Sequence, residues 1–386
     1  MSNIVVFAGS IAQKPKQGGL TWVFLQYLLG FRRLGWEVLF LDRLEPGMCV
    51  DSAGQPCSFD KSLNLHYFLE IMEGFDLAGS FSLNYNQGEC VLGLPRNDVL
   101  ERTRNSALLI NVMGFLNDEE VLRQTPMRVF LDIDPGFGQM WHDLGLSKVF
   151  YGHDAYVTIG LNIGRPGSEI PLCGLRWITT LQPIVLDYWK PVPVSRGESF
   201  TSVASWRGDY GPVEYQGKTY GLRVHEFRKF APLPRLCNRP FELALDIHQA
   251  DVKDRALLDA SGWSVVPPTA VAGDPWAYQA YVQGSKAEFM VAKNMYVQSQ
   301  SGWFSDRSIC YLASGKPVLA QDTGLKDLIP TGEGLLTFTT LKEAVAGAEE
   351  ISGNYLRHAR AARCIAEEIF DSDKVLGRLL SKLAVA

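Results

Sequence analysis

The hydrophobic positions of this chain fall into two alternating patterns, short apolar runs and longer segments with helical spacing. The first apolar run is Ile4–Ala8, and Phe24, Leu28 and Phe31 then recur at helical intervals. A second apolar run follows at 38–41. Short apolar runs are typical of buried strands, and the spaced positions predict a helix. This strand–helix–strand order predicts a parallel sheet with a right-handed crossover.

The same alternation continues along both halves of the chain. In the first half it predicts further strands at 108–112, 128–131 and 155–159. In the second half it predicts strands at 201–204, 241–247, 263–266, 289–291, 317–320 and 335–338, separated by helices. Residues 42–105 show a less regular pattern. Strands that alternate with helices indicate the α/β class.

The length of the chain predicts more than one domain. A single hydrophobic core stops growing at about 250–300 residues, and this chain has 386. The stiff, proline-containing stretch at 189–193 separates the two strand series. We therefore expect one domain over 1–190, a second over 191–370 and a terminal helix over 371–386.

Composition and charge narrow the class of protein. The formal net charge of −5 gives no sign of a surface for polyanions. The seven cysteines form no C-x-x-C pair, which favours reduced thiols and a cytoplasmic location. No apolar run approaches the ~20 residues of a spanning helix, so we expect no membrane span.

The segment from 302 to 324 carries the clearest candidate chemistry. Ser305 is a good helix N-cap residue, and Asp306 suits the positive first turn. An apolar strand at 318–320 then opens into a loop containing Thr323 and Gly324. In open α/β sheets ligands bind beyond the carboxyl ends of the strands. This order of elements predicts a site for an anionic ligand.

Arg307 stands beside the same helix start. A guanidinium group can bind a phosphate through two hydrogen bonds. Arg307 is therefore a candidate phosphate ligand, and an ion pair with Asp306 or another carboxylate is its alternative role.

The capped helix, the sequence Ala-Ser-Gly-Lys-Pro-Val at 313–318 and the Thr-Gly loop resemble the donor half of GT-B glycosyltransferases. The likeness is to the group-1, glycogen-synthase-like branch, which includes enzymes of antibiotic glycosylation and phage-encoded members. It implies two Rossmann-like domains that face each other across a cleft, an N-terminal acceptor domain and a C-terminal domain for a nucleotide-diphosphate sugar. It also implies that the last helix packs back on the first domain. Gly302 and Cys310 stand where the branch has two glutamates, so the anomeric outcome stays open.

Two more cations are candidates for the donor diphosphate. In the resembling fold, the loop after the first strand of the second domain brings an arginine or lysine to this group. Here that loop contains Arg207, and Lys218 lies a short loop away. Such cations stabilise the charge of a departing nucleotide diphosphate, so the resemblance implies transfer without a metal. The alternative is an exposed loop with no site, and Arg207 is favoured over Lys218.

Gly18 and Gly19 precede the first long helix. Glycine lets a backbone approach a ligand closely, and a helix N-terminus favours negative charge. The resemblance implies that these two residues border the sugar and the acceptor. The alternative is a tight turn between a strand and a helix.

Three residues are candidates for chemistry in the first domain. Asp132 and Asp134 follow the strand at 128–131, and such a pair could hold a divalent cation. The favoured interpretation is that Asp134 faces the cleft and acts on an acceptor hydroxyl. His153 is either a histidine satisfied by the backbone or, by resemblance, a contact of the transferred sugar.

The sequence therefore predicts a metal-independent glycosyltransferase whose donor is a nucleotide-diphosphate sugar. The acceptor is a small molecule or, as an alternative, a hydroxylated base in DNA. The basic residues that would serve a DNA acceptor are Lys14, Lys16, Arg32, Arg33, Arg102, Arg104, Arg123 and Arg128. The pattern also leaves open a nucleotide-sugar epimerase and a nucleotide-sugar-binding protein without transfer activity.

Overall fold

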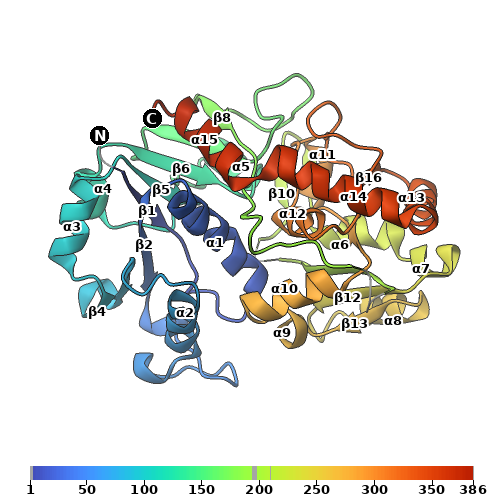
Figure 1. Cartoon of the computed structure of the whole chain (residues 1–386), viewed down its shortest axis with the longest axis horizontal. Helices are drawn as coiled ribbons and strands as arrows, with labels where there is room; N and C mark the ends of the chain where they lie inside the picture. The colour runs from blue at the N-terminus through green and yellow to red at the C-terminus, as the bar shows by residue number, and fades with distance from the viewer. Residues whose placement is uncertain (1–2, 194–197, 209, 386) are drawn as a thin grey trace.

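Two sheets, one from each half of the chain, organise the structure (Figure 1). It is a computed structural model that describes residues 3–193, 198–208 and 210–385. The strands of each sheet alternate with helices along the chain. This arrangement confirms the predicted α/β class with two parallel-sheet halves, which we call the N-terminal and C-terminal lobes.

The N-terminal sheet has eight strands in the order β4-β3-β2-β1-β5-β6-β7-β8. Only the edge pair β3/β4 is antiparallel. The strands are β1 (Ile4–Ala8), β2 (Glu37–Leu44), β3 (Phe81–Tyr85), β4 (Cys90–Gly93), β5 (Leu108–Val112), β6 (Arg128–Asp132), β7 (Ala155–Thr158) and β8 (Trp177–Thr179). Because β1, β5 and β6 are buried on both faces, they read as largely apolar runs.

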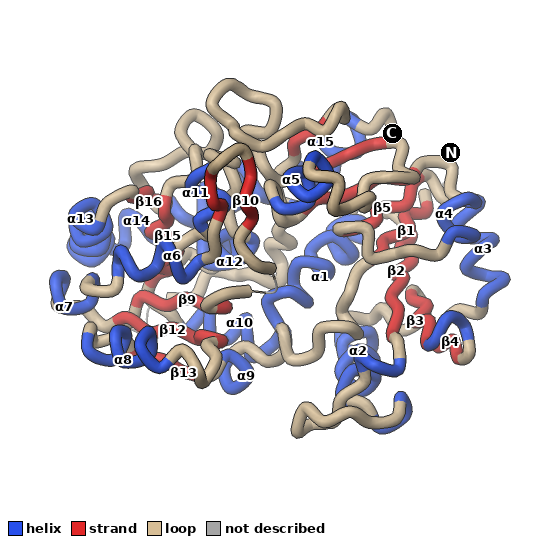
Figure 2. The backbone as a smooth tube through the Cα atoms, turned by 180° about the vertical axis from the view of Figure 1, so that it is seen from behind, coloured by secondary structure: helices blue, strands red, loops and turns tan. Residues whose placement is uncertain are grey.

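The C-terminal sheet has six parallel strands in the order β13-β12-β9-β14-β15-β16. They are β9 (Phe200–Ser205), β12 (Phe241–Asp246), β13 (Ser264–Val266), β14 (Ala287–Met290), β15 (Val318–Gln321) and β16 (Leu335–Phe338). A separate antiparallel hairpin, β10 (Val213–Tyr215) and β11 (Lys218–Tyr220), stands beside α11 (Figure 2).

The helices cover the sheets and connect the lobes. They are α1 (Gly18–Arg33), α2 (Leu63–Gly74), α3 (Arg96–Arg104), α4 (Glu119–Gln124), α5 (Phe137–Asp143), α6 (Arg223–Phe227), α7 (Leu233–Cys237), α8 (Val252–Ala260), α9 (Pro268–Val271), α10 (Pro275–Gly284), α11 (Asn294–Gln298), α12 (Asp306–Ala313), α13 (Leu341–Gly353), α14 (Tyr355–Ile365) and α15 (Ser372–Lys382). No helix within the described ranges is both long and apolar enough to cross a bilayer.

The sequence pattern located the central strands well. The predicted strands 4–8, 108–112 and 335–338 match β1, β5 and β16 to the residue, and the ends of the others shift by one to three residues. The pattern missed β3, β4, β8 and the hairpin, which are short or lie at an edge. The domain limits at 190 and 370 stay a prediction.

Helix α1 joins the two lobes. Its first residues enter the C-terminal lobe, where the Trp22 indole donates a hydrogen bond to the Pro275 carbonyl over 2.7 Å. Its last turn meets α15, where the Arg33 Nε lies 3.0 Å from the Asp373 carboxylate. Figure 1 shows α15 returning from the C-terminal lobe to cover α1. One apolar cluster consequently runs through both lobes.

The loop between β1 and α1 is anchored by a buried carboxylate on β2. Asp42 accepts hydrogen bonds from the Ala12 backbone amide over 2.7 Å and from the Gln13 side chain over 3.1 Å. Burial raises the pKa of Asp42 to about 7, although these donors favour the ionised form.

This buried carboxyl predicts a pH dependence of stability. Between about pH 4 and about pH 7 the unfolded chain has released a proton that the folded chain still holds at Asp42. The free energy of unfolding should therefore fall as pH rises through this window. In the Asp42→Asn variant, the slope of the free energy of unfolding against pH should be less steep by up to about 1.4 kcal/mol per pH unit. Urea unfolding across the window measures it.

The control for this experiment is Asp259→Asn, an exposed residue near the end of α8. It should keep the slope of the unmodified protein. An unchanged slope in Asp42→Asn would show that this carboxyl is not the source.

Candidate active site

The carboxyl end of β6 meets the start of α11 where the two lobes touch. Asp134, just after β6, accepts a hydrogen bond from the Lys293 ammonium over 2.6 Å. The Tyr296 hydroxyl donates to the other oxygen of the same carboxylate. The side chains of Asp134 and Lys293 keep 17% and 20% of their exposure, so solvent still reaches this pair.

Aromatic rings surround Lys293. Its ammonium lies 5.1 Å from the ring centroid of Phe137, 5.4 Å from that of Tyr296 and 5.7 Å from that of Tyr210. The negative faces of such rings attract a cation. The rings therefore hold the lysine at the contact between the lobes and lower its exposure to water.

Arg223 occupies the first turn of α6, beyond the carboxyl ends of β9 and β14. Its guanidinium donates to the Val291 carbonyl over 3.1 Å and to the Ser205 carbonyl over 3.2 Å. Burial first, and then the charge of Arg307, lowers the pKa of Arg223 to about 10. The Arg223 side chain stays a cation at neutral pH. Because Arg307 adds a second positive charge nearby, this region favours the binding of an anion.

Arg307, predicted as a phosphate ligand, is buried on α12 and paired with a carboxylate. Its Nε lies 2.5 Å from Glu288 on β14, and its Nη1 donates to the Val203 carbonyl over 2.7 Å. Burial disfavours its charge, but Glu288 holds the pKa of Arg307 above its usual value. The structure thus shows Arg307 in an ion pair, which was the alternative to its role as a phosphate ligand.

The pair is incompletely satisfied. Arg307 Nη2 and Glu288 Oε2 are buried and have no hydrogen-bond partner among the described residues. The unpaired Nη2 donor belongs to Arg307, whose charge is close enough to lower the pKa of Arg223. These groups, namely Asp134, Lys293, Tyr296, Arg223, Arg307 and Glu288, form what we call the seam cluster.

Ser305 and Asp306 begin α12, beside the seam cluster. Ser305 is the N-cap residue by position, yet its side chain makes no capping hydrogen bond. Asp306 faces α1 and lines, with Tyr27 and Gln182, a cavity of about 10 Å³. That is the space of a single water molecule. Burial raises the pKa of the Asp306 carboxyl.

Thr323 and Gly324 follow β15, and Gly324 lies against a loop of the N-terminal lobe. The Thr323 hydroxyl donates to the Trp303 carbonyl over 2.5 Å. The Asn162 amide donates to the Gly324 carbonyl over 2.8 Å and to the Gln300 carbonyl over 3.0 Å. In this arrangement, these polar groups are therefore occupied by hydrogen bonds to other elements of the protein.

Gly18 and Gly19 serve close packing. A Cβ atom at Gly18 would lie 2.2 Å from the Asp274 carbonyl oxygen, and one at Gly19 would lie 2.9 Å from the Tyr278 ring. The Gly18 amide donates to the Ala272 carbonyl over 3.0 Å. Both glycines thus let α1 approach the C-terminal lobe closely, and their place beside a ligand stays a prediction.

His153 makes its polar contacts within the N-terminal lobe. Its Nε2 lies 3.1 Å from the Asn111 amide nitrogen, a donor, and its Nδ1 lies 3.2 Å from the Phe150 carbonyl. These partners require a neutral ring with the proton on Nδ1. Burial lowers the pKa of His153, in agreement with that form. The interpretation as a satisfied histidine fits the structure.

Arg207 and Lys218 are paired at the surface. The Arg207 Nε lies 3.2 Å from both carboxylate oxygens of Asp251. Lys218 lies 2.5 Å from Glu169, so it ties the hairpin to the N-terminal lobe. The structure does not bring either cation into the seam cluster.

Asp132 is a buried structural carboxylate. It accepts hydrogen bonds from Gln139 over 2.7 Å, from Thr158 over 2.8 Å and from the Asp134 amide over 3.1 Å. Burial raises the pKa of Asp132 to about 6. Within the described part of the chain, no group of three or more histidine, cysteine, aspartate or glutamate side chains is arranged to hold a metal ion.

Sequence reasoning missed Arg223, Lys293 and Tyr296. One local signal was available for Arg223, because a cation is disfavoured in the first turn of a helix. Lys293 follows the apolar run 289–291 closely, which places it at a strand end. No pattern in the sequence pairs it with Asp134, since that contact forms only when the lobes meet.

The fold is similar to that of solved glycosyltransferases. An α-glucosyltransferase in complex with UDP-glucose and DNA containing an abasic site matches with a TM-score of 0.59 and 12% identity, over 99% of each chain. HepE from Anabaena, in complex with UDP and glucose, matches with a TM-score of 0.57 and 12% identity, over 99% of this chain and 100% of that one.

AviGT4, a glycosyltransferase of avilamycin A biosynthesis, matches with a TM-score of 0.55 and 12% identity, over 98% of this chain and 96% of that one. No protein-family model matches the sequence, and neither does any curated protein. At this identity the likeness shows the fold, which is the predicted one of two facing Rossmann-like domains.

The buried ion pair of the seam cluster predicts a strong effect on stability. Arg307→Met leaves the Glu288 carboxylate buried and unpaired, which should lower the free energy of unfolding by about 3–5 kcal/mol. Urea unfolding measures this loss. Arg207→Met, which removes an exposed cation, should change stability little.

The double variant Glu288→Met with Arg307→Met separates pairing from packing. Because both charges are gone, it should recover most of the lost stability. A double variant as unstable as Arg307→Met would contradict the view that the unpaired charge causes the loss.

Proposed function

We propose that this chain, which has the GT-B fold, transfers a sugar from a nucleotide-diphosphate donor to an acceptor hydroxyl without a metal ion. The observation that carries the proposal is the seam cluster, where Lys293, Arg223 and Arg307 gather opposite Asp134. It lies beyond the carboxyl ends of β9 and β14, where open α/β sheets bind ligands.

The cations suit the leaving group of such a transfer. When the bond from the sugar to the diphosphate breaks, negative charge grows on the diphosphate oxygens, and positioned cations stabilise it. Arg223 and Lys293 are the groups that meet the diphosphate. Arg307 is held by Glu288 and does not bind the diphosphate directly. Its charge adds to the positive potential around Arg223.

Asp134 suits the acceptor side. A carboxylate within hydrogen-bond reach of the acceptor hydroxyl can take up its proton as the new bond forms. Tyr296 donates to Asp134 and so holds the carboxylate in one orientation. In the absence of ligand, Lys293 neutralises Asp134, and a bound diphosphate would take over that lysine.

The proposal requires the lobes to part and close during turnover. The contact of Asp134 with Lys293 and that of Asn162 with Gly324 both bridge the lobes and fill the space between them. Ligand entry must break these contacts, and closure afterwards excludes water that would hydrolyse the donor. All seven cysteines are free thiols, which fits a reaction in the cytoplasm.

A thermal-shift panel with UDP, GDP, ADP, TDP and CDP, each with and without EDTA, tests the donor. A ligand that binds the folded state raises the unfolding midpoint. We expect one nucleotide to do so whether or not EDTA is present. Lys293→Gln and Arg223→Gln should each weaken its binding by about tenfold or more, which is about 1.4 kcal/mol. Lys253→Gln, an exposed lysine on α8, is the matched control.

Asp134→Asn tests the acceptor step. With the matching nucleotide sugar, transfer to the acceptor should fall by about 10²–10⁴, whereas the nucleotide should bind at least as tightly, because Lys293 loses its competing carboxylate. No shift with any nucleotide would overturn the donor site. Stabilisation that disappears with EDTA would overturn metal independence, and full activity of Asp134→Asn would remove this residue from the reaction.

A hydroxylated base in DNA is the alternative acceptor, since one similar structure contains DNA with an HMU base. Several of the basic residues that would serve it are neutralised. The ion pairs are Arg32 with Asp76, Arg33 with Asp187 and Asp373, Arg102 with Glu37, and Arg128 with Asp154. Paired cations release few counterions on binding DNA. Titration of labelled duplex DNA at low salt decides between the two acceptors.

Product analysis separates transfer from epimerisation and from binding alone. A nucleotide-sugar epimerase would change the sugar and leave it on the nucleotide, and a binding protein would leave the donor intact. Chromatography of a labelled donor after incubation with the protein distinguishes these outcomes from release of the free nucleotide.

A further inference from the structure

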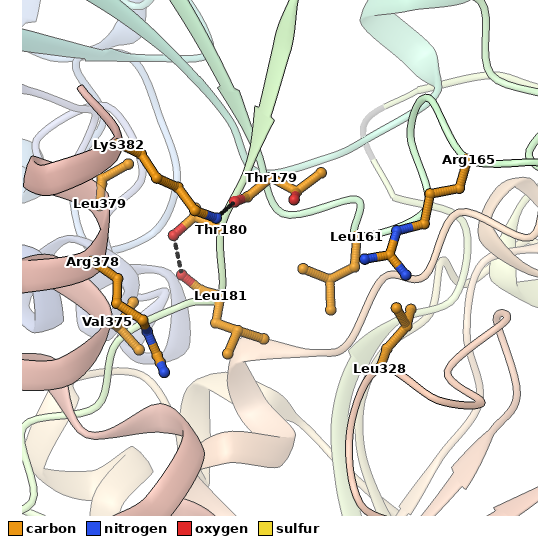
Figure 3. Close-up of a pocket in the computed structure, with 10 residues that line it drawn as sticks. All are labelled: Leu161, Arg165, Thr179, Thr180, Leu181, Leu328, Val375, Arg378, Leu379 and Lys382. Carbon is orange, nitrogen blue, oxygen red and sulfur yellow. Dashed lines mark hydrogen bonds between the residues drawn. The ribbon is translucent and has the colours of Figure 1, made fainter. Parts of the chain in front are cut away.

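A cavity of about 160 Å³ opens where α15 meets the ends of both sheets, apart from the seam cluster (Figure 3). One wall is α15. The opposite wall is formed by the loop after β7, with Leu161 and Arg165, and by Leu328 from the loop after β15. The segment that follows β8 contributes the floor between them. Elements of both lobes therefore build this cavity.

Three cations line it. Arg378 and Lys382 stand four residues apart on α15, so they share one face of the helix. Arg165 reaches toward Leu161 and Leu328 from the other wall, as Figure 3 shows. None of the ten lining residues is acidic. A concave surface of one charge sign concentrates its field and attracts ions of the opposite sign.

The cations keep donors available for a ligand. Lys382 donates one hydrogen bond to the Thr179 carbonyl over 2.8 Å, and Arg378 donates one to the Ile369 carbonyl over 2.9 Å. An ammonium has three donors and a guanidinium has five. These single bonds fix the direction of each side chain and leave most of its N–H groups unused.

Apart from Thr179 and Thr180, the side chains that complete the lining are apolar. Leu161, Leu181 and Leu328 lie between the cations, and Leu379 of α15 is buried beside them. A free inorganic ion would leave these apolar side chains exposed to water. An anion that carries a small organic part would cover them and gain the free energy of their burial.

We propose that this cavity is a binding site for a small phosphomonoester. A phosphomonoester carries a charge between −1 and −2 near neutral pH, which three cations can match. Guanidinium groups bind its oxygens in pairs. Because Leu328 of the C-terminal lobe and the loop after β7 of the N-terminal lobe both line the cavity, the bound molecule contacts both lobes. This inference goes beyond the proposed function and does not depend on it.

Calorimetric titration with glycerol 3-phosphate tests the site on the full chain. We expect saturable binding, weaker binding of inorganic phosphate and no binding of glycerol. The double variant Arg378→Gln with Lys382→Gln, and the single variant Arg165→Gln, should each weaken binding by about tenfold or more. Arg360→Gln removes an exposed arginine of α14 outside the cavity and should leave the affinity unchanged.

Two further measurements make the result specific. The unliganded variants should unfold at the same temperature as the unmodified protein, because the replaced side chains are exposed. Arg223→Gln, which alters the seam cluster, should still bind glycerol 3-phosphate saturably. The absence of saturable binding, equal affinity in all cavity variants, or loss of binding in Arg223→Gln would each overturn the proposal. A failed donor site would leave this result untouched.

Discussion

The packing of α1 into both lobes is the constraint on which the rest of the structure depends. Its N-terminal part lies against the C-terminal lobe, with the Trp22 ring 5.0 Å from that of Trp189 in the connector. Its C-terminal part lies under α15, where Gly30 faces Leu376. Burial of large aromatic rings is a major source of packing energy. Two Rossmann-like domains that could move independently are thus joined by one core.

The core shared by the two lobes determines which groups meet in the candidate active site. Because α1 and the connector bring the lobes together, the end of β6 reaches α11 and the Asp134 carboxylate meets Lys293. The same contact between the lobes uses the amide of Gly18, a residue that the resemblance placed beside the sugar and the acceptor. The structure therefore represents a closed arrangement, held by polar contacts that a charged ligand can replace and by apolar contacts that it cannot.

The sequence predicted those features that depend on local pattern. Continuous apolar runs identified β1, β5 and β16, and Gly315 ends α12 with a φ of 69°, the left-handed conformation expected of a glycine at a helix end. It did not predict which charges pair. Arg307 and Glu288 are 19 residues apart and meet because β14 and α12 are packed together, and the partners Asp134 and Lys293 belong to different lobes. Pairing of this kind depends on tertiary geometry, for which a single sequence carries no period.

One short loop takes part both in the cavity beside α15 and in the contact between the lobes. Leu161 lines the cavity beside α15, and its neighbour Asn162 bonds to Gly324 and Gln300 at the contact between the lobes. A ligand that favours the closed position of this loop also favours the contacts of Asn162. If a second ligand favours an open position of the same loop, each ligand weakens the binding of the other by the same factor.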